Sequence, residues 1–204
     1  MDRNSINIIS KIVLTCVVII LIIIQYDLQY VLLINININN FFIVIISFLI
    51  LLFIGLLIVY FGFSRECLEI MENHEVVNGL LRGQFNVLYL SFLITMIMEE
   101  LIFRYLIIKI LKYVFLEEFI VILISAVIFS LYHIHIWFEF KKFRITLSYI
   151  SFSFLVGLFL NNVFYRLGLL FCIILHYVIA LFVYFLLSRR IEKYRDNSKI
   201  IRQV

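Results

Sequence analysis

Apolar runs of about 20 residues recur along this chain and restrict the folds open to it. The clearest of them, 41–63, contains no charged residue. A helix of roughly 20 residues spans the hydrocarbon core of a bilayer. Hydrophobic residues make up 65% of the chain and charged residues 15%, whereas soluble proteins average roughly 45–50% and ~25%. The sequence therefore predicts an all-α, polytopic transmembrane helical bundle and excludes an ordinary soluble domain.

We expect one membrane domain over residues 1–204, with about six spans and one short interfacial helix. The spans are predicted near 12–24 (extendable to Ile34), 41–63, 85–110, 118–136, 145–164 and 167–187. The polar insertion 64–84 would hold the interfacial helix, ended by Asn78 and Gly79. Residues 188–204 would form a basic, solvated cytoplasmic tail.

The distribution of Lys and Arg predicts the orientation of this bundle. With six spans, thirteen of the 17 basic residues fall on one side and three on the other, while Arg104 lies within a span. Both termini are therefore expected on the cytoplasmic side of what we take to be a prokaryotic cell membrane. The net charge of +4 is small, so the lipid bilayer is an expected partner and nucleic acid is not.

Three ionisable residues, Glu99, Glu100 and Arg104, interrupt the third predicted span. Each would cost at least ~2.5–3.5 kcal/mol in hydrocarbon, so their presence needs a reason. On a helix, Glu100 and Arg104 are i,i+4 neighbours and can form an ion pair. Glu99 is rotated by about 100° from Glu100 and has no such local partner. One carboxylate is thus expected to be structural and the other to be free for chemistry.

Histidines in two further spans, His133 and His176, share this desolvation cost. Convergence of all these groups on one hydrated cavity would offset it. There, Glu99 could act as a general base on water, while a histidine stabilises an oxyanion or protonates a leaving nitrogen. Alternatively, the histidines and the glutamate could hold a metal whose bound water attacks. We expect no cofactor, with a zinc ion as the less favoured alternative.

These residues fall into three ordered motifs. Glu99-Glu100-Leu-Ile-Phe-Arg104 fits EExxxR, and Phe129-Ser-Leu-Tyr-His133 fits FxxxH one span later. A glycine-led span from Phe154, a turn at Gly168 and then His176 fit a third block. Together they resemble the CPBP family, the CAAX-protease and bacteriocin-processing (Abi) intramembrane proteases, over about 85–187.

The resemblance implies a conical helical bundle that hydrolyses a peptide bond in an intramembrane cavity, without requiring a metal. It implies that Glu99 activates water, that His133 assists, and that Arg104 orients Glu100. It also implies that His176 and an Asn or Asp four residues later bind the oxyanion. This chain departs from the pattern there, since Ala180 cannot donate a hydrogen bond. Asn161 or Asn162 on the preceding span could substitute.

Three functions remain open on the sequence. The first is an intramembrane endopeptidase acting on a peptide or membrane-protein substrate, in CAAX-type processing, peptide maturation or bacteriocin self-immunity. The second is a catalytically impaired member that binds partners or confers immunity, and the third is a small proton-coupled transporter. Outside the motifs, we expect His135 to be interfacial, His74 to be solvated, and Glu117 and Glu118 to form the first turn of a helix.

Overall fold

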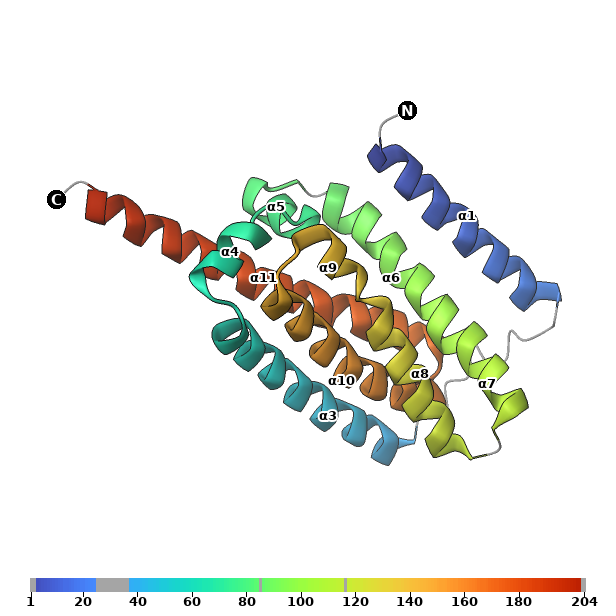
Figure 1. Ribbon diagram of the computed structural model, residues 1–204. Helices are drawn as coiled ribbons and strands as arrows, with labels where there is room; N and C mark the ends of the chain where they lie inside the picture. The colour runs from blue at the N-terminus through green and yellow to red at the C-terminus, as the bar shows by residue number, and fades with distance from the viewer. Residues whose placement is uncertain (1–2, 25–36, 85, 116, 203–204) are drawn as a thin grey trace.

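The computed structural model describes residues 3–24, 37–84, 86–115 and 117–202, which form helices and connecting turns without any strand (Figure 1). The elements are α1 (Arg3–Ile24), α3 (Ile38–Leu57), η1 (Ile58–Gly62), α4 (Arg65–Met71), α5 (Glu75–Arg82), η2 (Val87–Phe92), α6 (Leu93–Glu100), η3 (Leu101–Ile107), α7 (Ile108–Val114), α8 (Glu118–Tyr132), α9 (His135–Phe140), α10 (Phe143–Leu167) and α11 (Leu169–Arg202). Here η denotes a π-helix. The segments η2, α6, η3 and α7 follow one another without a break and form one long helix.

Four helical stretches among the described residues are long and apolar enough to cross a membrane. They are Ile38–Gly62, Glu118–Phe140, Phe143–Leu167 and Leu169–Asp196. The other two predicted spans are also helical. The apolar part of α1, Ile8–Ile24, is shorter, and its predicted extension to Ile34 lies outside the described residues. The long helix from η2 to α7 carries Glu99, Glu100 and Arg104. The chain is thus an integral membrane protein of the helical-bundle class.

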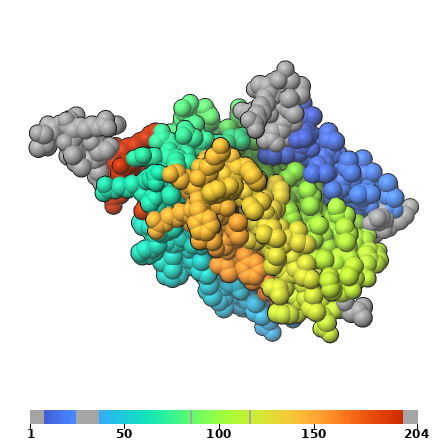
Figure 2. Space-filling model, in the orientation of Figure 1, coloured from blue at the N-terminus to red at the C-terminus, as the bar shows by residue number. Residues whose placement is uncertain are grey.

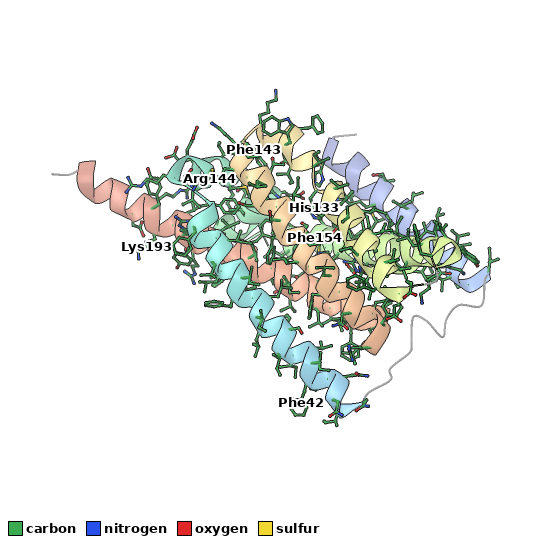
Figure 3. The ribbon with its side chains drawn as sticks, turned by 60° about the horizontal axis from the view of Figure 1, so that its bottom comes forward. Phe42, His133, Phe143, Arg144, Phe154 and Lys193 are labelled. Carbon is green, nitrogen blue, oxygen red and sulfur yellow. The ribbon has the colours of Figure 1, made fainter. Side chains whose placement is uncertain are left out.

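Helix α10 lies at the centre of the bundle and packs against α8, α11 and α3. Figure 2 shows α8, α9 and the start of α10 covering the middle of one face, with α6 and α7 to one side and α3 to the other. In the turned view, Phe42 at the start of α3 lies at the opposite end of the bundle from Phe143 and Arg144 at the start of α10 (Figure 3). Apolar burial between these helices forms the main core.

The α8–α10 contact is close because Gly157 carries no side chain. A Cβ atom added there would lie 3.1 Å from Cα of Ala126 and 3.3 Å from Cδ1 of Phe129. The glycine therefore lets the two backbones approach and sets where the Phe129 ring stands. Helix α8 itself begins at Glu118 with Glu117 as its N-cap residue, in agreement with the expected first turn.

The polar insertion forms two short helices, α4 and α5, where the sequence predicted one. Asn78 and Gly79 lie inside α5, which ends only at Gly83, in the left-handed conformation at φ 65°. Ending the helix at Asn78 and Gly79 was wrong because the glycine needed for a left-handed C-cap is the next one along. The apolar residues of the insertion pack against α11, with Met71 and Val77 fully buried.

The expected solvated tail begins instead as part of the bundle. Helix α11 continues without a break past Leu187, and Ser188 and Ile191 are buried. Ile191 packs in the same cluster as Cys67 and Leu68 of α4. The basic composition concealed this packing, since long cationic side chains flank apolar positions that face the neighbouring helix.

Candidate active site

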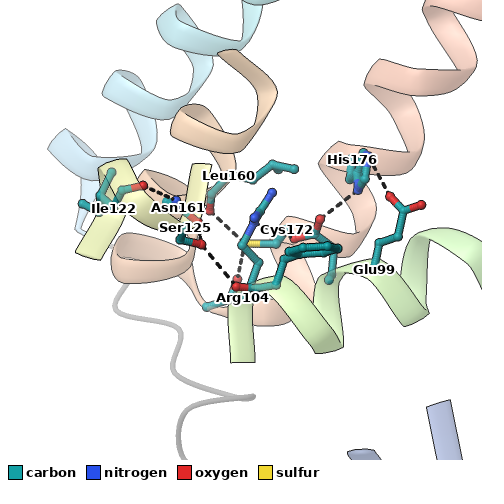
Figure 4. Close-up of polar contacts among 11 residues, drawn as sticks. Glu99, Arg104, Ile122, Ser125, Leu160, Asn161, Cys172 and His176 are labelled. Carbon is teal, nitrogen blue, oxygen red and sulfur yellow. Dashed lines mark hydrogen bonds and ion pairs between the residues drawn. The ribbon is translucent and has the colours of Figure 1, made fainter. Parts of the chain in front are cut away.

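Arg104, Glu100 and His176 form a buried polar chain between the long helix and α11 (Figure 4). Arg104 Nε lies 3.1 Å from Glu100 Oε2, at the predicted i,i+4 spacing. His176 Nδ1 lies 2.8 Å from Glu100 Oε1. Both Glu100 and Arg104 are fully buried. A carboxylate only accepts hydrogen bonds. Nδ1 of His176 therefore carries a hydrogen and donates a hydrogen bond to Glu100.

The other ring nitrogen of His176 faces Glu99. Its Nε2 lies 4.0 Å from Glu99 Oε2, which is too far for a direct hydrogen bond. Oε2 of Glu99 has no hydrogen-bond partner among the described residues, although Glu99 is only 4% exposed. The two neighbouring glutamates thus have different surroundings. Glu100 is paired on both oxygens, whereas the nearest ionisable partner found for Glu99 among the described residues is Nε2 of His176.

The Phe129 ring lies against Arg104 and against both histidines. The Arg104 Cζ atom lies 4.5 Å from the ring centroid, which is cation–π geometry. The same ring meets those of His133 and His176 edge to face, at centroid distances of 5.0 and 5.6 Å. His133 Nδ1 also lies 3.0 Å from the Phe129 carbonyl oxygen, which fixes its ring in the turn after α8. Both residues of the FxxxH motif therefore take part in the site.

A cavity of about 1100 Å³ opens beside these residues. Its walls include Glu99, His133 and His176, but not Glu100 or Arg104, which lie behind them. The cavity therefore brings together three of the five predicted site residues, and the other two support them. His135, expected at the interface, is exposed and lines the same cavity.

Several lining residues had not been selected from the sequence. Lys11 of α1 donates from Nζ to Thr95 Oγ1 at 2.8 Å, one helical turn before Glu99. Tyr149 of α10 and Tyr184 of α11 meet hydroxyl to hydroxyl at 3.2 Å. No short motif joins these residues, because they come from three helices far apart in the sequence. The remaining signal was their polarity within apolar segments.

His74 is a further cavity residue, half-buried against α11, whereas the sequence predicted a freely solvated side chain. Its Nδ1 accepts a hydrogen bond from the Val76 N–H at 3.3 Å, which caps α5, and its Nε2 lies 3.2 Å from the Tyr184 hydroxyl. The imidazole stacks on the Tyr184 ring. Burial, followed by the nearby His135, lowers the pKa of His74 to about 4. The apolar faces of α4 and α5 fold the insertion against the bundle and carry His74 inward.

Neither predicted asparagine faces the cavity. Asn161 is fully buried, donates from Nδ2 to the Ile122 carbonyl at 2.8 Å, and accepts from the Ser125 hydroxyl at 3.4 Å. Figure 4 shows these contacts on the far side of Arg104 from Glu99. Asn162 accepts from Arg166 Nε at 2.6 Å. Asn161 links α10 to α8, whereas Asn162 pairs with Arg166 on its own helix, so neither amide supplies the donor missing at Ala180.

A catalytic zinc ion would need about three protein ligands close together. Within the described part of the chain, no three His, Cys, Asp or Glu side chains are grouped so that they could hold a metal ion. Glu100 is engaged by Arg104 and His176, which leaves Glu99 and Nε2 of His176 as adjacent donors. The three free cysteines, Cys16, Cys67 and Cys172, add none.

Comparison with known proteins gives one result. Residues 82–182 match the model of the family described as type II CAAX prenyl endopeptidase Rce1-like. No match was found among curated proteins or solved structures. The matched segment contains the EExxxR and FxxxH motifs and His176, all of which meet at the buried site. The chain therefore belongs to the CPBP family of CAAX-type intramembrane proteases.

Proposed function

We propose that this protein is an intramembrane endopeptidase of the glutamate type, in which Glu99 activates the water that cleaves a peptide bond. One observation carries the proposal. Glu99 Oε2 and His176 Nε2 stand 4.0 Å apart on the wall of a large cavity, with no closer partner for the carboxylate oxygen among the described residues.

The distance between these two atoms suits a bridging water. A water oxygen about 2.8 Å from each would complete a triangle of ordinary hydrogen bonds. In an imidazole that carries its one hydrogen on Nδ1, as the contact with Glu100 requires, Nε2 is an acceptor, as is the Glu99 carboxylate. Such a water would donate one hydrogen to each of them, and its lone pairs would point into the cavity.

Hydrolysis then follows from ordinary general acid–base chemistry. Glu99 takes a proton as the water oxygen bonds to the carbonyl carbon, and the electron pair of the C=O bond moves to oxygen. When the C–N bond breaks, the proton passes from Glu99 to the departing nitrogen. A carboxylic acid and an amine leave, and Glu99 is again a carboxylate. The Arg104–Glu100 pair keeps His176 in the required tautomer and orientation.

We further propose a substrate that enters as an extended peptide at the membrane. CAAX-type processing, peptide maturation and bacteriocin self-immunity all supply such a substrate. The proposed orientation, with both termini in the cytoplasm, would open the cavity toward that side, where His74 and His135 lie on its wall.

The test compares Glu99→Gln with the unchanged protein in liposomes. Substrates would be fluorogenic peptides, with and without a prenylated C-terminal cysteine motif. Glu99→Gln is expected to lower kcat by about 10²–10⁴-fold, the usual contribution of a general base. Glu117→Gln, a solvent-exposed glutamate at the start of α8, is the matched control and should cleave normally. Equal turnover by Glu99→Gln and the unchanged protein would refute the proposal.

A second candidate, a binding protein without turnover, is favoured by Ala180, which lines the cavity yet has no hydrogen-bond donor in its side chain. It predicts peptide binding to the unchanged protein with no product, and no gain of cleavage in Ala180→Asn. Product formation by the unchanged protein decides in favour of the endopeptidase.

A further inference from the structure

Ser153 of α10 is a cavity residue that the mechanism above does not use. Its side chain lines the cavity, and the residue is only 7% exposed. It makes no hydrogen bond with any described residue, whereas Thr146 and Ser148 on the same helix donate to carbonyls four residues back, at 3.2 and 2.9 Å. The Ser153 hydroxyl is not among the fully enclosed polar atoms that lack a partner. Its position on the cavity wall gives it access to a ligand instead.

The packing of α10 against α11 places Ser153 beside the reacting groups. The two helices run antiparallel. Tyr149 is hydrogen-bonded to Tyr184 at one level, and the Cys172 thiol is hydrogen-bonded to the Leu160 carbonyl at another. Stepping one turn at a time from Tyr149 brings Ser153 level with Ala180, and then Gly157 level with His176. Ser153 therefore stands about one turn, or ~5.4 Å along the axis, from the level of His176.

Two hydroxyls on the long helix that line this wall already donate hydrogen bonds. Thr95 donates to the Ser91 carbonyl at 2.8 Å, and Ser91 donates to Glu75 Oε1 at 3.2 Å. Asn161 and Asn162 face away, as described above. Tyr132 of α8 also lines the cavity, and no hydrogen bond to its hydroxyl is found within the described residues, so it is the competing donor.

We propose that Ser153 is a catalytic residue whose hydroxyl donates a hydrogen bond to the oxyanion of the tetrahedral intermediate. The inference rests on the proposed endopeptidase function. When the water oxygen bonds to the carbonyl carbon, the displaced electron pair leaves a negative charge on the former carbonyl oxygen. The Ser153 O–H stabilises that charge from α10, across from Ala180 on α11, and no proton is transferred. A donor of this kind acts mainly in the transition state.

The experiment compares Ser153→Ala with Ser151→Ala, which removes an exposed hydroxyl from the same helix. Loss of one oxyanion donor typically lowers kcat by about 10²–10³-fold. We expect that loss in Ser153→Ala with little change in KM, while Ser151→Ala keeps its activity and Ser153→Thr, which retains the hydroxyl, loses less kcat than Ser153→Ala. Adding Ala180→Asn to Ser153→Ala should restore turnover, because the amide supplies a donor at the same level from the facing helix.

Each outcome decides the matter. Equal kcat values for Ser153→Ala and Ser151→Ala overturn the inference. A loss of kcat in Tyr132→Phe that Ser153→Ala does not share also overturns it. A loss in Ser153→Ala that Ala180→Asn does not restore also overturns it, since a packing defect would behave in that way. If Ser153→Ala fails to fold in a thermal melt, Ser153→Cys, close in size but a weak donor, takes its place. An inactive unchanged protein refutes the proposed function and this inference with it, whereas an active one with a normal Ser153→Ala refutes only the inference.

Discussion

At the residue scale, the neighbouring carboxylates have different roles: that of Glu100 is structural and that of Glu99 is chemical. On one helix, adjacent residues point about 100° apart, so they meet different neighbours. Glu100 meets Arg104 and His176 in the protein interior, and Glu99 meets the cavity. Substitutions at the two positions should therefore have different effects.

Arg104→Met should destabilise the protein by about 3–5 kcal/mol, because it leaves the Glu100 carboxylate buried without its cation. Loss of activity should accompany loss of stability. Glu99→Gln should unfold at nearly the same temperature as the unchanged protein. Thermal unfolding in detergent measures both. Equal unfolding temperatures for Arg104→Met and Glu99→Gln would contradict this division of roles.

At the element scale, the α8–α10 contact positions Phe129 and, through it, both histidines. Gly157→Ala would put a Cβ atom 3.1 Å from the Ala126 backbone and 3.3 Å from the Phe129 ring. Overpacking of this kind costs about 1–3 kcal/mol. We expect lower stability together with a lower kcat, because the Phe129 ring must shift.

Thermal unfolding and peptide cleavage test the Gly157→Ala prediction, with Ser151→Ala as the control on the exposed side of α10. Unchanged unfolding and cleavage in Gly157→Ala would show that the close approach is not required.

The turn between α4 and α5 should respond to pH through His74. The pKa of His74 is lowered from about 6.5 to about 4 by burial and by His135. The unfolded chain therefore binds this proton more readily than the folded protein does. The contribution of neutral His74 to the stability of the folded protein is therefore complete above pH ~6.5 and is lost as the pH falls toward 4.

His74→Asn keeps a side-chain acceptor for the α5 N-cap but removes the titration. We expect the unfolding temperature of the unchanged protein to fall more than that of His74→Asn between pH 7.5 and 5. Parallel falls in the two proteins would exclude His74 as the titrating group.

At the scale of the whole molecule, α11 connects the site to the packed insertion. Beyond Leu187, Arg190 Nη1 donates to the Val59 carbonyl, and Arg195 pairs with Glu72 of the insertion. Ile191 is 2% exposed in the cluster that also holds Met71. The second half of α11 thus holds η1 and the insertion in place, and residues of both line the cavity.

Truncation after Leu187 should therefore lower both stability and activity, whereas truncation after Asp196 should leave both close to normal. The two shortened chains can be compared by detergent solubility, thermal unfolding and peptide cleavage. Normal behaviour of the shorter chain would restore the original expectation of a solvated tail.

Much of the fold was predictable because apolar length and helical spacing act locally. The runs of apolar residues predicted the helices, and the i,i+4 spacing predicted the Glu100–Arg104 pair. Errors arose where tertiary packing decides the environment of a polar residue. His74 was expected in solvent and Asn161 was a candidate for the cavity, yet the first lines the cavity and the second bonds to α8.

The sequence alone determined that this protein is a helical membrane bundle with ionisable groups at fixed positions along its spans, because hydrophobicity and periodicity are properties of each segment. Tertiary structure decided which of those groups face one another. The position of His176 between the two glutamates, and the presence of Ser153 and Ala180 on one cavity wall, depend on the register and rotation of α10, α11 and the long helix. Side-chain packing between segments distant in the chain fixes these quantities, and no single segment encodes them.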